Sequence, residues 1–495
     1  MPDTFSRNQA PDSGIGRSIW IVLPLAVADL VASFETTMVH AAFKSVLEEF
    51  GDPVTSGWLV TAYLLVAAGT AAVVGRLGDL VGRRRVLVAT ILVAVAGSLV
   101  SALAPTLPGI IFGRAVQGVA VAILPLCFGL LREHLPERQV PFCIGLITAV
   151  SAIGTSAGLI GGGAVVDHFG WRSIFWVSSS IGLIAALLVH LMLPASHRAG
   201  GEIRIDMPGA LLFPPAVGLV LLAVSKGGAW GWSSHWTSAS LVSGLLLLAV
   251  WTWHELRHPD PLIKIRELRD RTILMAYAAL MFAALGTFQV VPFFTLLFQQ
   301  PAWTGAGFGL TATTAGLLQL PSTFSVIIGA PIAGWLCGRY GGKAVIAGGA
   351  LLCTGAWIVT LARFTDLNWL VPALASAALG TAVLYTGVPA VIIARVAAGR
   401  VSEATGLLAV VRSLTGAAGA QFLVIALATT TVTDGSRGPG TFPASQAYHA
   451  ALIVFILMSG AAMIAALLIP GDTRLRSSND ETGDRASPGA LRAPS

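Results

Sequence analysis

Fourteen apolar runs, most of them about 20 residues long, constrain the fold of this chain more than any other feature. A transmembrane helix needs about 20 consecutive apolar residues to cross the hydrocarbon core. The composition agrees, because the chain is 55% hydrophobic and only 11% charged. We therefore predict an all-α polytopic membrane protein with 14 transmembrane helices. The runs cover residues 19–40, 57–74, 86–103, 110–131, 142–165, 174–193, 209–225, 238–253, 273–298, 315–335, 344–361, 369–394, 404–429 and 450–470.

The distribution of positive charge predicts the orientation. Most of the 30 Lys and Arg residues fall in loops that share one side of the membrane if the N-terminus is cytoplasmic. The positive-inside rule then places both termini in the cytoplasm of a plasma-membrane protein. The net charge of +6 follows from this bias, so we expect no nucleic-acid partner. The four cysteines show no paired spacing and predict neither a disulfide framework nor a metal site.

A short basic hairpin at residues 75–85 is the strongest functional signal. Its arginines, including Arg83 and Arg84, suit a cytoplasmic loop, but the positive-inside rule does not require the single acid Asp79. Gly75 and Gly82 indicate a tight turn and close backbone approach. A carboxylate facing arginines across such a turn predicts a latch that a moving membrane protein can make and break.

A degraded copy of this hairpin at residues 334–343 indicates an internal duplication. Both hairpins follow the second span of a six-span block, and the two shorter spans between the blocks form an insert. Repeat-built bundles with a site between the halves are typical of secondary transporters. The predicted organisation is a cytoplasmic N-terminal tail (1–18), an N-terminal six-helix bundle (19–198), a two-helix insert (199–256), a C-terminal six-helix bundle (257–471) and a disordered cytoplasmic tail (472–495).

Ionisable residues within the spans mark the candidate functional site, because a charge in hydrocarbon is costly. Asp29 and Glu35 lie roughly 15 and 24 Å along the first span, and Arg114 reaches nearly the depth of Glu35 from the other side. The arginine could favour one acid or alternate between the two. A purely structural ion pair is the alternative. Arg412 is equally compatible with a gate, with helix packing or with a lipid-facing position.

Several motifs resemble those of the major facilitator superfamily, in its branch of fourteen-span drug/proton antiporters. The hairpin with Gly75, Asp79 and Arg83 is similar to the signature hairpin of the family. The resemblance implies the major facilitator fold of two six-helix bundles plus two extra helices, and a role in proton coupling for Arg114. The other matching residues are Gln117 and Gly118 beside that arginine, an antiporter-type glycine motif (Gly154, Gly158, Gly162 and Gly163) and a second-half motif (Arg412, Gly416 and Gly419).

The departures from the family pattern concern the first and fifth spans. The first-span motif of this branch has an aspartate where Glu35 stands, so the acid is kept in a longer form. Leu159 replaces the proline of the fifth-span motif, which bears on the local kink but not on the glycine packing. The second half has no obvious acid within its spans, which favours neutral, zwitterionic or singly charged cationic substrates.

We therefore expect a proton-driven exporter of small, amphipathic or toxic molecules that works by alternating access. Glu35 is assigned as the main proton carrier, Asp29 as a second acid and Arg114 as the coupling partner. Polar candidates for the substrate cavity are Gln117, Gln289, Gln319 and Tyr385.

Other functions remain open from the sequence alone. A facilitator-fold transporter of one metabolite is the alternative, and a membrane enzyme or receptor would need a cluster of His, Asp or Glu that the sequence does not suggest. We expect no catalytic site, no metal and no cofactor besides the proton. The expected form is a monomer in the lipid bilayer.

Overall fold

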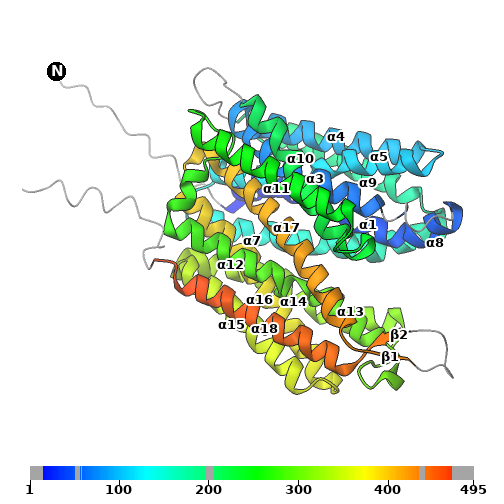
Figure 1. The fold of residues 1–495 in the computed structure, drawn as a ribbon. Helices are drawn as coiled ribbons and strands as arrows, with labels where there is room; N and C mark the ends of the chain where they lie inside the picture. Colours follow the sequence, from blue (N-terminus) through cyan, green and yellow to red (C-terminus); the bar gives the residue numbers. More distant parts are fainter. Residues whose placement is uncertain (1–14, 51–55, 57, 197–205, 434–440, 471–495) are drawn as a thin grey trace, which may run out of the picture.

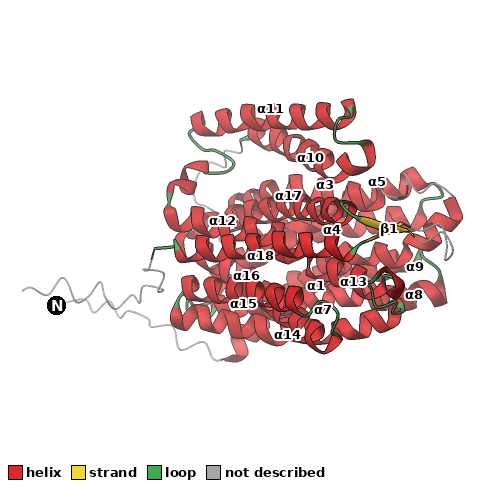
Figure 2. Cartoon of the chain, turned by 60° about the horizontal axis from the view of Figure 1, so that its bottom comes forward, coloured by secondary structure: helices red, strands yellow, loops and turns green. Residues whose placement is uncertain are grey.

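The computed structural model of the chain is almost entirely helical and describes residues 15–50, 56, 58–196, 206–433 and 441–470 (Figure 1). The predicted tails at 1–18 and 472–495 lie outside the described residues, except that 15–18 begin the first helix. The first residues of the predicted insert, 199–205, also lie outside them. Strands β1 (Thr431–Thr433) and β2 (Thr441–Pro443) form a short antiparallel pair in which Val432 faces Phe442 (Figure 2).

The first bundle contains six membrane passes, three of them single helices besides the long first helix. Two passes change helix type midway: a 3-10 turn (Gly118–Ala122) joins α5 to α6, and a π-helical turn (Ala157–Gly161) joins α7 to α8. The helices are α1 (Ile15–Phe50), α3 (Trp58–Val81), α4 (Arg83–Leu103), α5 (Leu107–Gln117), α6 (Ile123–His134), α7 (Val140–Ser156), α8 (Gly162–Phe169) and α9 (Ser173–Met192).

The helices of the insert and of the second bundle come next in the chain. The insert consists of α10 (Met207–Trp230) and α11 (His235–Arg257). The second bundle begins with a pass that is divided by a 3-10 turn (Thr287–Gln289) into α12 and α13. Its helices are α12 (Arg271–Leu285), α13 (Val290–Gln299), α14 (Ala312–Tyr340), α15 (Gly342–Ala362), α16 (Leu367–Arg395), α17 (Val401–Ala428) and α18 (Ser445–Leu467), with short 3-10 turns at Ile265–Arg269, Ala302–Thr304 and Ala398–Arg400.

The described residues contain thirteen helical segments that are long and apolar enough to cross a membrane. The fifth predicted span is divided by the π-helical turn, and its longer part, Val140–Ser156, is an apolar helix just below the length of a full span. Helical structure is nevertheless unbroken from residue 140 to 169. Counted as one pass, it completes the 14 predicted spans of a multi-pass membrane protein.

Helices α3 and α17 join the two bundles along one seam. A side-chain carbon at Gly75 would overlap the carbonyl oxygen of Ser402, and one at Gly406 would lie 2.6 Å from the carbonyl oxygen of Ala71. Glycine is therefore required at both positions if the backbones are to approach this closely.

Helices α7 and α14 form a second seam with the same pattern of glycine contacts. A side-chain carbon at Gly334 would overlap the carbonyl oxygen of Pro141, and one at Gly145 would overlap that of Ala330. In both seams the paired glycine contacts are four positions apart, which is one helical turn. The duplication inferred from the two hairpins is therefore present in the packing between the bundles.

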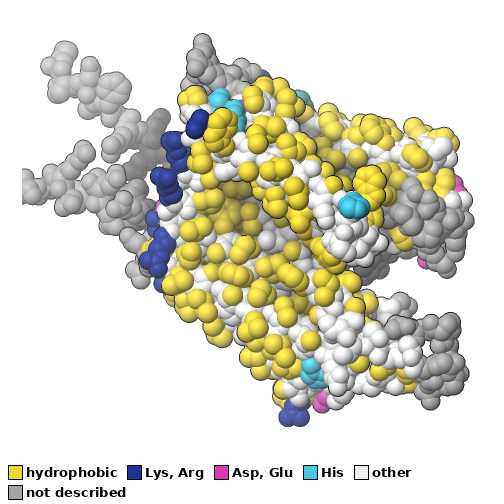
Figure 3. All heavy atoms as spheres, in the orientation of Figure 1, with side chains coloured by type: hydrophobic (Ala, Val, Ile, Leu, Met, Phe, Trp, Pro, Cys, Tyr) yellow, Lys and Arg dark blue, Asp and Glu magenta, His cyan; other side chains and the backbone are white. Residues whose placement is uncertain are grey.

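The two seams close one end of the molecule, which we call the basic end because it carries the α3–α4 turn at Gly82 and the α14–α15 turn at Gly341. Both turn glycines have positive φ, at 115° and 85°. Lys and Arg side chains gather at this end of the surface, and the molecule is hollowed between its halves at the opposite end (Figure 3).

The insert covers only one of the seams. Helix α10 packs against α3 and α17, and α11 packs against α10. Ring packing between Phe213 and Trp251, with centroids 4.6 Å apart, holds the two insert helices together. Figure 2 shows the insert on one side of the molecule and α7 with α14 on the opposite side.

Candidate functional site: a buried polar network and a latch between the bundles

Glu35 is fully buried in the first bundle, where side chains from three other helices surround its carboxylate. Its Oε1 accepts hydrogen bonds from Ser178 (2.6 Å), Ser98 (3.0 Å) and the amide of Gln117 (3.4 Å). Its Oε2 is buried and has no hydrogen-bond partner. The carboxylate is thus held at one oxygen by neutral donors, while the other oxygen makes no hydrogen bond.

Arg114 lies at the depth of Glu35 and is also fully buried. Its guanidinium donates to the backbone oxygen of Glu35 (3.0 Å), to Oε1 of Gln117 (2.9 Å) and to the carbonyl of Leu59 (3.2 Å). It also lies over the ring of Tyr63, 4.4 Å from the centroid. Its Nη2 has no partner. Arg114 therefore binds the backbone of Glu35 and, like the carboxylate beside it, keeps one polar atom unpaired.

Asp29 lies on α1 and is almost fully buried. Ser151 of α7 donates a hydrogen bond to its Oδ2, and Arg412 of α17 lies within electrostatic range. The guanidinium of Arg412 also lies over the ring of Tyr385, 5.2 Å from the centroid. The sequence left the position of Arg412 open. The structure places it toward the centre of the molecule, opposite an acid of the first bundle.

The exposure of polar residues along α1 rises toward the open end. Asp29 is 2% exposed, whereas Ser33, Thr36 and Thr37 are partly exposed and His40 is exposed. These residues lie on one face of α1, with Asp29 at the buried end of the stripe, whereas Glu35 points from another face into the first bundle.

An ion pair at the open end lies outside the membrane-spanning segment of α1. Glu49 accepts hydrogen bonds from the indole of Trp171 (2.7 Å) and from Arg172 (3.0 Å). These donors lower the pKa of the Glu49 carboxyl below its usual value, so it stays ionised at neutral pH.

The antiporter-type glycines set the distance between α7 and α1. A side-chain carbon at Gly154 would lie 2.9 Å from the carbonyl of Leu30, and one at Gly158 would lie 2.7 Å from that of Phe34. Gly162 has only ordinary contacts, and Gly163 faces open space. Two of the four motif glycines therefore account for the close packing.

The second-half motif packs in a comparable way. A side-chain carbon at Gly419 would lie 2.5 Å from the carbonyl of Leu285 at the end of α12. Gln289 donates to the carbonyl of Gly416 (3.1 Å) from the 3-10 turn that follows α12. The motif therefore holds α17 against a break in the neighbouring helix.

The hairpin forms a latch that joins the bundles at the basic end. Asp79 lies 2.7 Å from Nε of Arg83. Its carboxylate also accepts the backbone N–H groups of Glu403 (2.9 Å) and Ser402 (3.3 Å), in the first turn of α17. An acid at a helix N-terminus is stabilised by free N–H groups and by the helix dipole. Arg83 in turn donates to Ser402 (3.0 Å) and to the carbonyl of Ala398.

A second layer of charges surrounds the latch. Glu403 pairs with Arg400 (3.0 Å) and Arg76 (3.5 Å), and Arg83 also pairs with Glu133 (3.3 Å). Arg84, which the sequence suggested as a partner of Asp79, instead donates to the carbonyl of His190 at the end of α9. The reason is geometric, because successive residues at the start of α4 point in different directions.

The latch is absent from the second seam, and the local sequence explains why. Gly338 stands one turn after Gly334, as Asp79 does after Gly75, so this seam has no carboxylate at that position. Pro141, which stands where Ser402 does in the first seam, has no N–H to donate. The two seams therefore share their packing but not their electrostatics.

The four cavity candidates occupy different environments. Gln117 is fully buried in the Glu35 network. Gln289 is 5% exposed, and its side-chain amide donates a hydrogen bond to the carbonyl of Gly416. Gln319 and Tyr385 are partly exposed. Tyr385 stacks on Phe288, with centroids 4.4 Å apart, and Gln319 donates to Thr295 (3.1 Å). Only the latter two have surface available to a ligand in this conformation.

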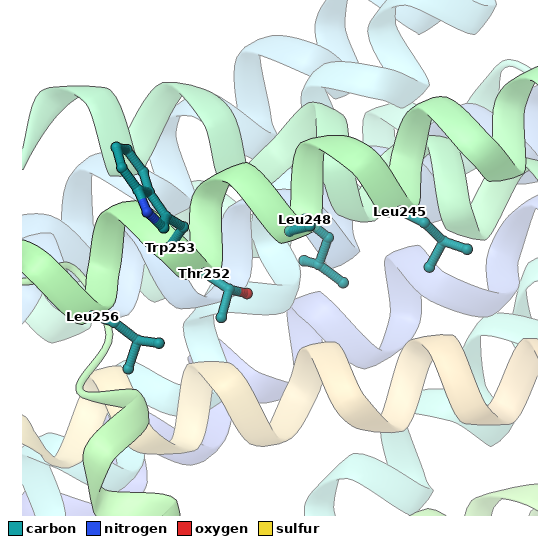
Figure 4. Close-up of a pocket in the computed structure, with 6 residues that line it drawn as sticks. Leu245, Leu248, Thr252, Trp253 and Leu256 are labelled. Atoms are coloured by element: carbon teal, nitrogen blue, oxygen red, sulfur yellow. The ribbon is translucent and has the colours of Figure 1, made fainter.

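An apolar groove beside α11 of the insert is separate from these sites. It runs along α11 and is lined by Leu245, Leu248, Ala249, Thr252, Trp253 and Leu256 (Figure 4). Its lining carries no charged group, which suits a surface that faces lipid.

Sequence reasoning missed several members of the network. Ser98 and Ser178 give no motif signal, because a serine in a span is common and gains meaning only from the acid it contacts. Glu403 could have been found as the only acid at the start of the α17 span, facing the hairpin across the duplicated seam. Arg76 lies inside the hairpin itself.

Comparison with known proteins gives a family. A model of the Major Facilitator Superfamily matches residues 25–420. The puromycin resistance protein pur8 of Streptomyces alboniger is 30% identical over 98% of this chain and 96% of its own length. The multidrug resistance protein Stp of Mycobacterium tuberculosis is 29% identical over 72% of the chain, and the tetracenomycin C resistance and export protein of Streptomyces glaucescens is 30% identical over 70%. The chain spans just under two thirds of the length of these two relatives, 66% and 64%.

Two solved structures resemble the fold. The human organic anion transporter MFSD10 has a TM-score of 0.63 at 15% identity, over 92% of this chain and 99% of that chain. The proton:xylose symporter XylE has a TM-score of 0.63 at 13% identity, over 92% and 96%. At these identities the likeness shows the fold alone.

Proposed function

Because this chain belongs to the major facilitator superfamily, we propose that it is a proton-coupled exporter of small, amphipathic molecules. The relatives named for resistance or export support efflux as the direction of transport. The basic end faces the cytoplasm in this proposal, in keeping with the positive-inside rule. The conformation is then closed to the cytoplasm and open to the outside.

The observation that carries the proposal is the environment of Glu35. A fully buried carboxylate with one unpaired oxygen lies beside an arginine with one unpaired nitrogen. In the proposed cycle, a proton from outside neutralises Glu35, and its release allows Oε2 to pair with Nη2 of Arg114. The charge state of the acid thus biases the packing around α1, and through α1 the relation of the two bundles.

Asp29 and Arg412 are proposed to work at the interface between the bundles. Asp29 belongs to the first bundle and Arg412 to the second. A substrate that binds between them, or a change in the protonation of Asp29, would therefore act directly on the interface between the bundles. Tyr385 provides a partly exposed ring beside Arg412. Thr36 forms a hydrogen bond with the hydroxyl of Tyr63 (3.0 Å), whose ring lies beneath Arg114, and so links the polar face of α1 to the Arg114 site.

The substrate class follows from the walls of the site and from the relatives. The second bundle contributes aromatic and amide groups but few acids, which suits neutral or singly charged molecules with apolar surface. Puromycin and tetracenomycin C, named for two relatives, are therefore the first probes. Cells with and without the gene should be compared for growth on both compounds.

The decisive experiment uses Glu35→Gln in proteoliposomes with an imposed pH gradient and a substrate identified in that screen. We expect gradient-driven accumulation to vanish, because glutamine cannot release a proton, while downhill exchange of substrate persists. Glu49→Gln is the matched control, because Glu49 lies at the exposed end of α1 and should leave coupling intact. If Glu35→Gln still concentrates substrate, the carrier is another group.

A further inference from the structure

The base of the insert holds a compact cluster of metal-ligating side chains. Asp206, at the N-cap of α10, faces His254 and His258 at the end of α11. One ligand atom from each lies within 4.8 Å of the others. The two imidazole rings are 5.3 Å apart at their centroids, and Nε2 of His254 is 2.8 Å from Oδ1 of Asp206. Three ligands therefore converge from the two helices of the hairpin.

Unpartnered polar atoms in this cluster indicate a missing ligand. Asp206 is 3% exposed, and its Oδ2 is buried without a hydrogen-bond partner. The Nδ1 of His258 and the Oε1 of Glu255 are also buried and unpartnered. Such atoms are costly in a protein interior unless something satisfies them.

Two of these atoms are carboxylate oxygens on the same side of the cluster. A side-chain carbon at Gly209 would contact Oδ2 of Asp206 and would lie 2.6 Å from Oε1 of Glu255, so glycine leaves room between the two acids. Two carboxylates placed this close repel each other when both are ionised. A cation placed here would offset that repulsion and satisfy the unpartnered atoms.

We propose that Asp206, His254 and His258 bind a divalent transition-metal ion such as Zn²⁺, with Glu255 balancing its charge. Two histidines at i and i+4 along a helix are a known zinc-binding spacing, met here by His254 in the last turn of α11 and His258 at its C-cap, and imidazole with carboxylate suits that ion. Tetrahedral zinc with bonds of about 2.0–2.1 Å holds its ligand atoms roughly 3.3 Å apart, which small side-chain movements would give here.

The site is connected to the latch through the segment that follows α11. The second oxygen of Glu255 accepts the N–H of Ile263 (3.2 Å). The next residue, Lys264, donates its N–H to Glu403 (2.9 Å), the residue that pairs with Arg76 and whose N–H binds Asp79. A bound ion would therefore hold the base of the insert and the connecting segment together, and stabilise the closed basic end.

The test is metal binding by the full-length protein with its affinity tag removed, using Zn²⁺ and the spectroscopic probe Co²⁺. We expect one ion per chain, and an affinity that falls about tenfold or more in Asp206→Asn and in His254→Gln. His235→Gln is the matched control, because His235 is exposed at the other end of α11. Absence of binding by the wild type, or equal affinity in the ligand variants and the control, would overturn the site.

A second measurement tests the connection and does not depend on transport. Hydrogen exchange at Ile263 and Lys264 should slow when Zn²⁺ is added to the wild type and stay unchanged when it is added to His254→Gln. His254→Gln removes a metal ligand without changing the fold. Its hydrogen exchange in the absence of Zn²⁺ should therefore match that of the wild type. Exchange that is unaffected by Zn²⁺ in the wild type would overturn the link to the latch.

Discussion

Arg114 shows how a single buried side chain can organise a site without forming a salt bridge to the neighbouring carboxylate of Glu35. Its hydrogen bonds go to two backbone carbonyls and one amide, and its flat face lies on Tyr63. A guanidinium can meet these directions at once because its donors are fixed in a plane. The backbone of α1 is thereby tied to α3 and α5 at the level of the acid.

Arg114→Lys should therefore lower transport by tenfold or more although the charge is kept, since an ammonium cannot make the same set of contacts. Initial rates of gradient-driven transport in proteoliposomes would measure this. Arg363→Lys is the matched control, because Arg363 lies over the exposed ring of Trp369 at the open end. Wild-type rates for Arg114→Lys would mean that the charge alone suffices.

Residue by residue, the sequence predicted positions better than contacts. The depth estimate placed Arg114 beside Glu35, and the structure does the same. It could not predict that the contact is to the backbone oxygen, because that depends on the rotation of α1 about its axis. The two histidines near the base of the insert had a readable spacing, but Asp206 is 48 positions from His254 and only the hairpin fold brings it there.

At the scale of elements, glycine spacing determines how closely helices approach. The contacts of Gly75 and Gly406 lie one turn apart on the α3–α17 seam, and those of Gly334 and Gly145 repeat this on the α7–α14 seam. Each contact puts a backbone carbonyl against a glycine, so no side chain separates the helices.

Gly75→Ala should weaken the closed basic end, because the added methyl group must displace the carbonyl of Ser402. Overpacking of this kind costs about 1–3 kcal/mol. The expected result is a lower thermal stability of the closed form, measured by unfolding in detergent. Gly348→Ala on α15 has open space around it and should leave the stability unchanged. Equal stabilities for the two variants would contradict the role of the seam.

Asp79→Asn tests the electrostatic part of the same element. The change removes the charge that binds Arg83 and the first turn of α17, and hydrogen bonds to charged groups contribute about 1.5–3 kcal/mol. Transport should fall roughly tenfold or more while membrane insertion is unaffected. Asp366→Asn is the control, because Asp366 caps α16 and asparagine caps a helix equally well. Normal transport by Asp79→Asn at normal expression would end the latch hypothesis.

The elements themselves were largely predictable, and their irregular parts were not. Apolar runs and charged loops predicted every pass, since length and hydropathy decide whether a helix can cross the bilayer. The π-helical turn at Ala157–Gly161 packs against α1, and the 3-10 break at Thr287–Gln289 packs against α17. Such packing is not visible in a hydropathy pattern, and neither is the use of Ser402 and Glu403 as partners of the hairpin.

For the molecule as a whole, the two ends differ in accessibility. Thr37 is partly exposed on the polar stripe of α1 that ends at Asp29, whereas Thr405 is 2% exposed behind the latch. All four native cysteines are buried, so they should react little with polar reagents.

Labelling with a membrane-impermeant maleimide should therefore modify Thr37→Cys from outside in intact cells. Thr405→Cys should stay unmodified from the inside in inverted vesicles until Asp79→Asn is added, because opening of the latch exposes α17. If Thr405→Cys reacts as fast as Thr37→Cys without that change, the closed basic end is not the resting state.

The unequal seams imply that the two bundles separate at one seam first while the other seam acts as a hinge. The edge that carries Asp79 is held by charge and is covered by α10, while the edge between α7 and α14 has the same close glycine packing but Pro141 and Gly338 in place of a donor and an acceptor. Release at the cytoplasmic side would then begin between α7 and α14, where the described residues place no insert helix. In the proposed orientation that gap would face the inner leaflet, so cargo dissolved in lipid would meet the entrance before cargo dissolved in water.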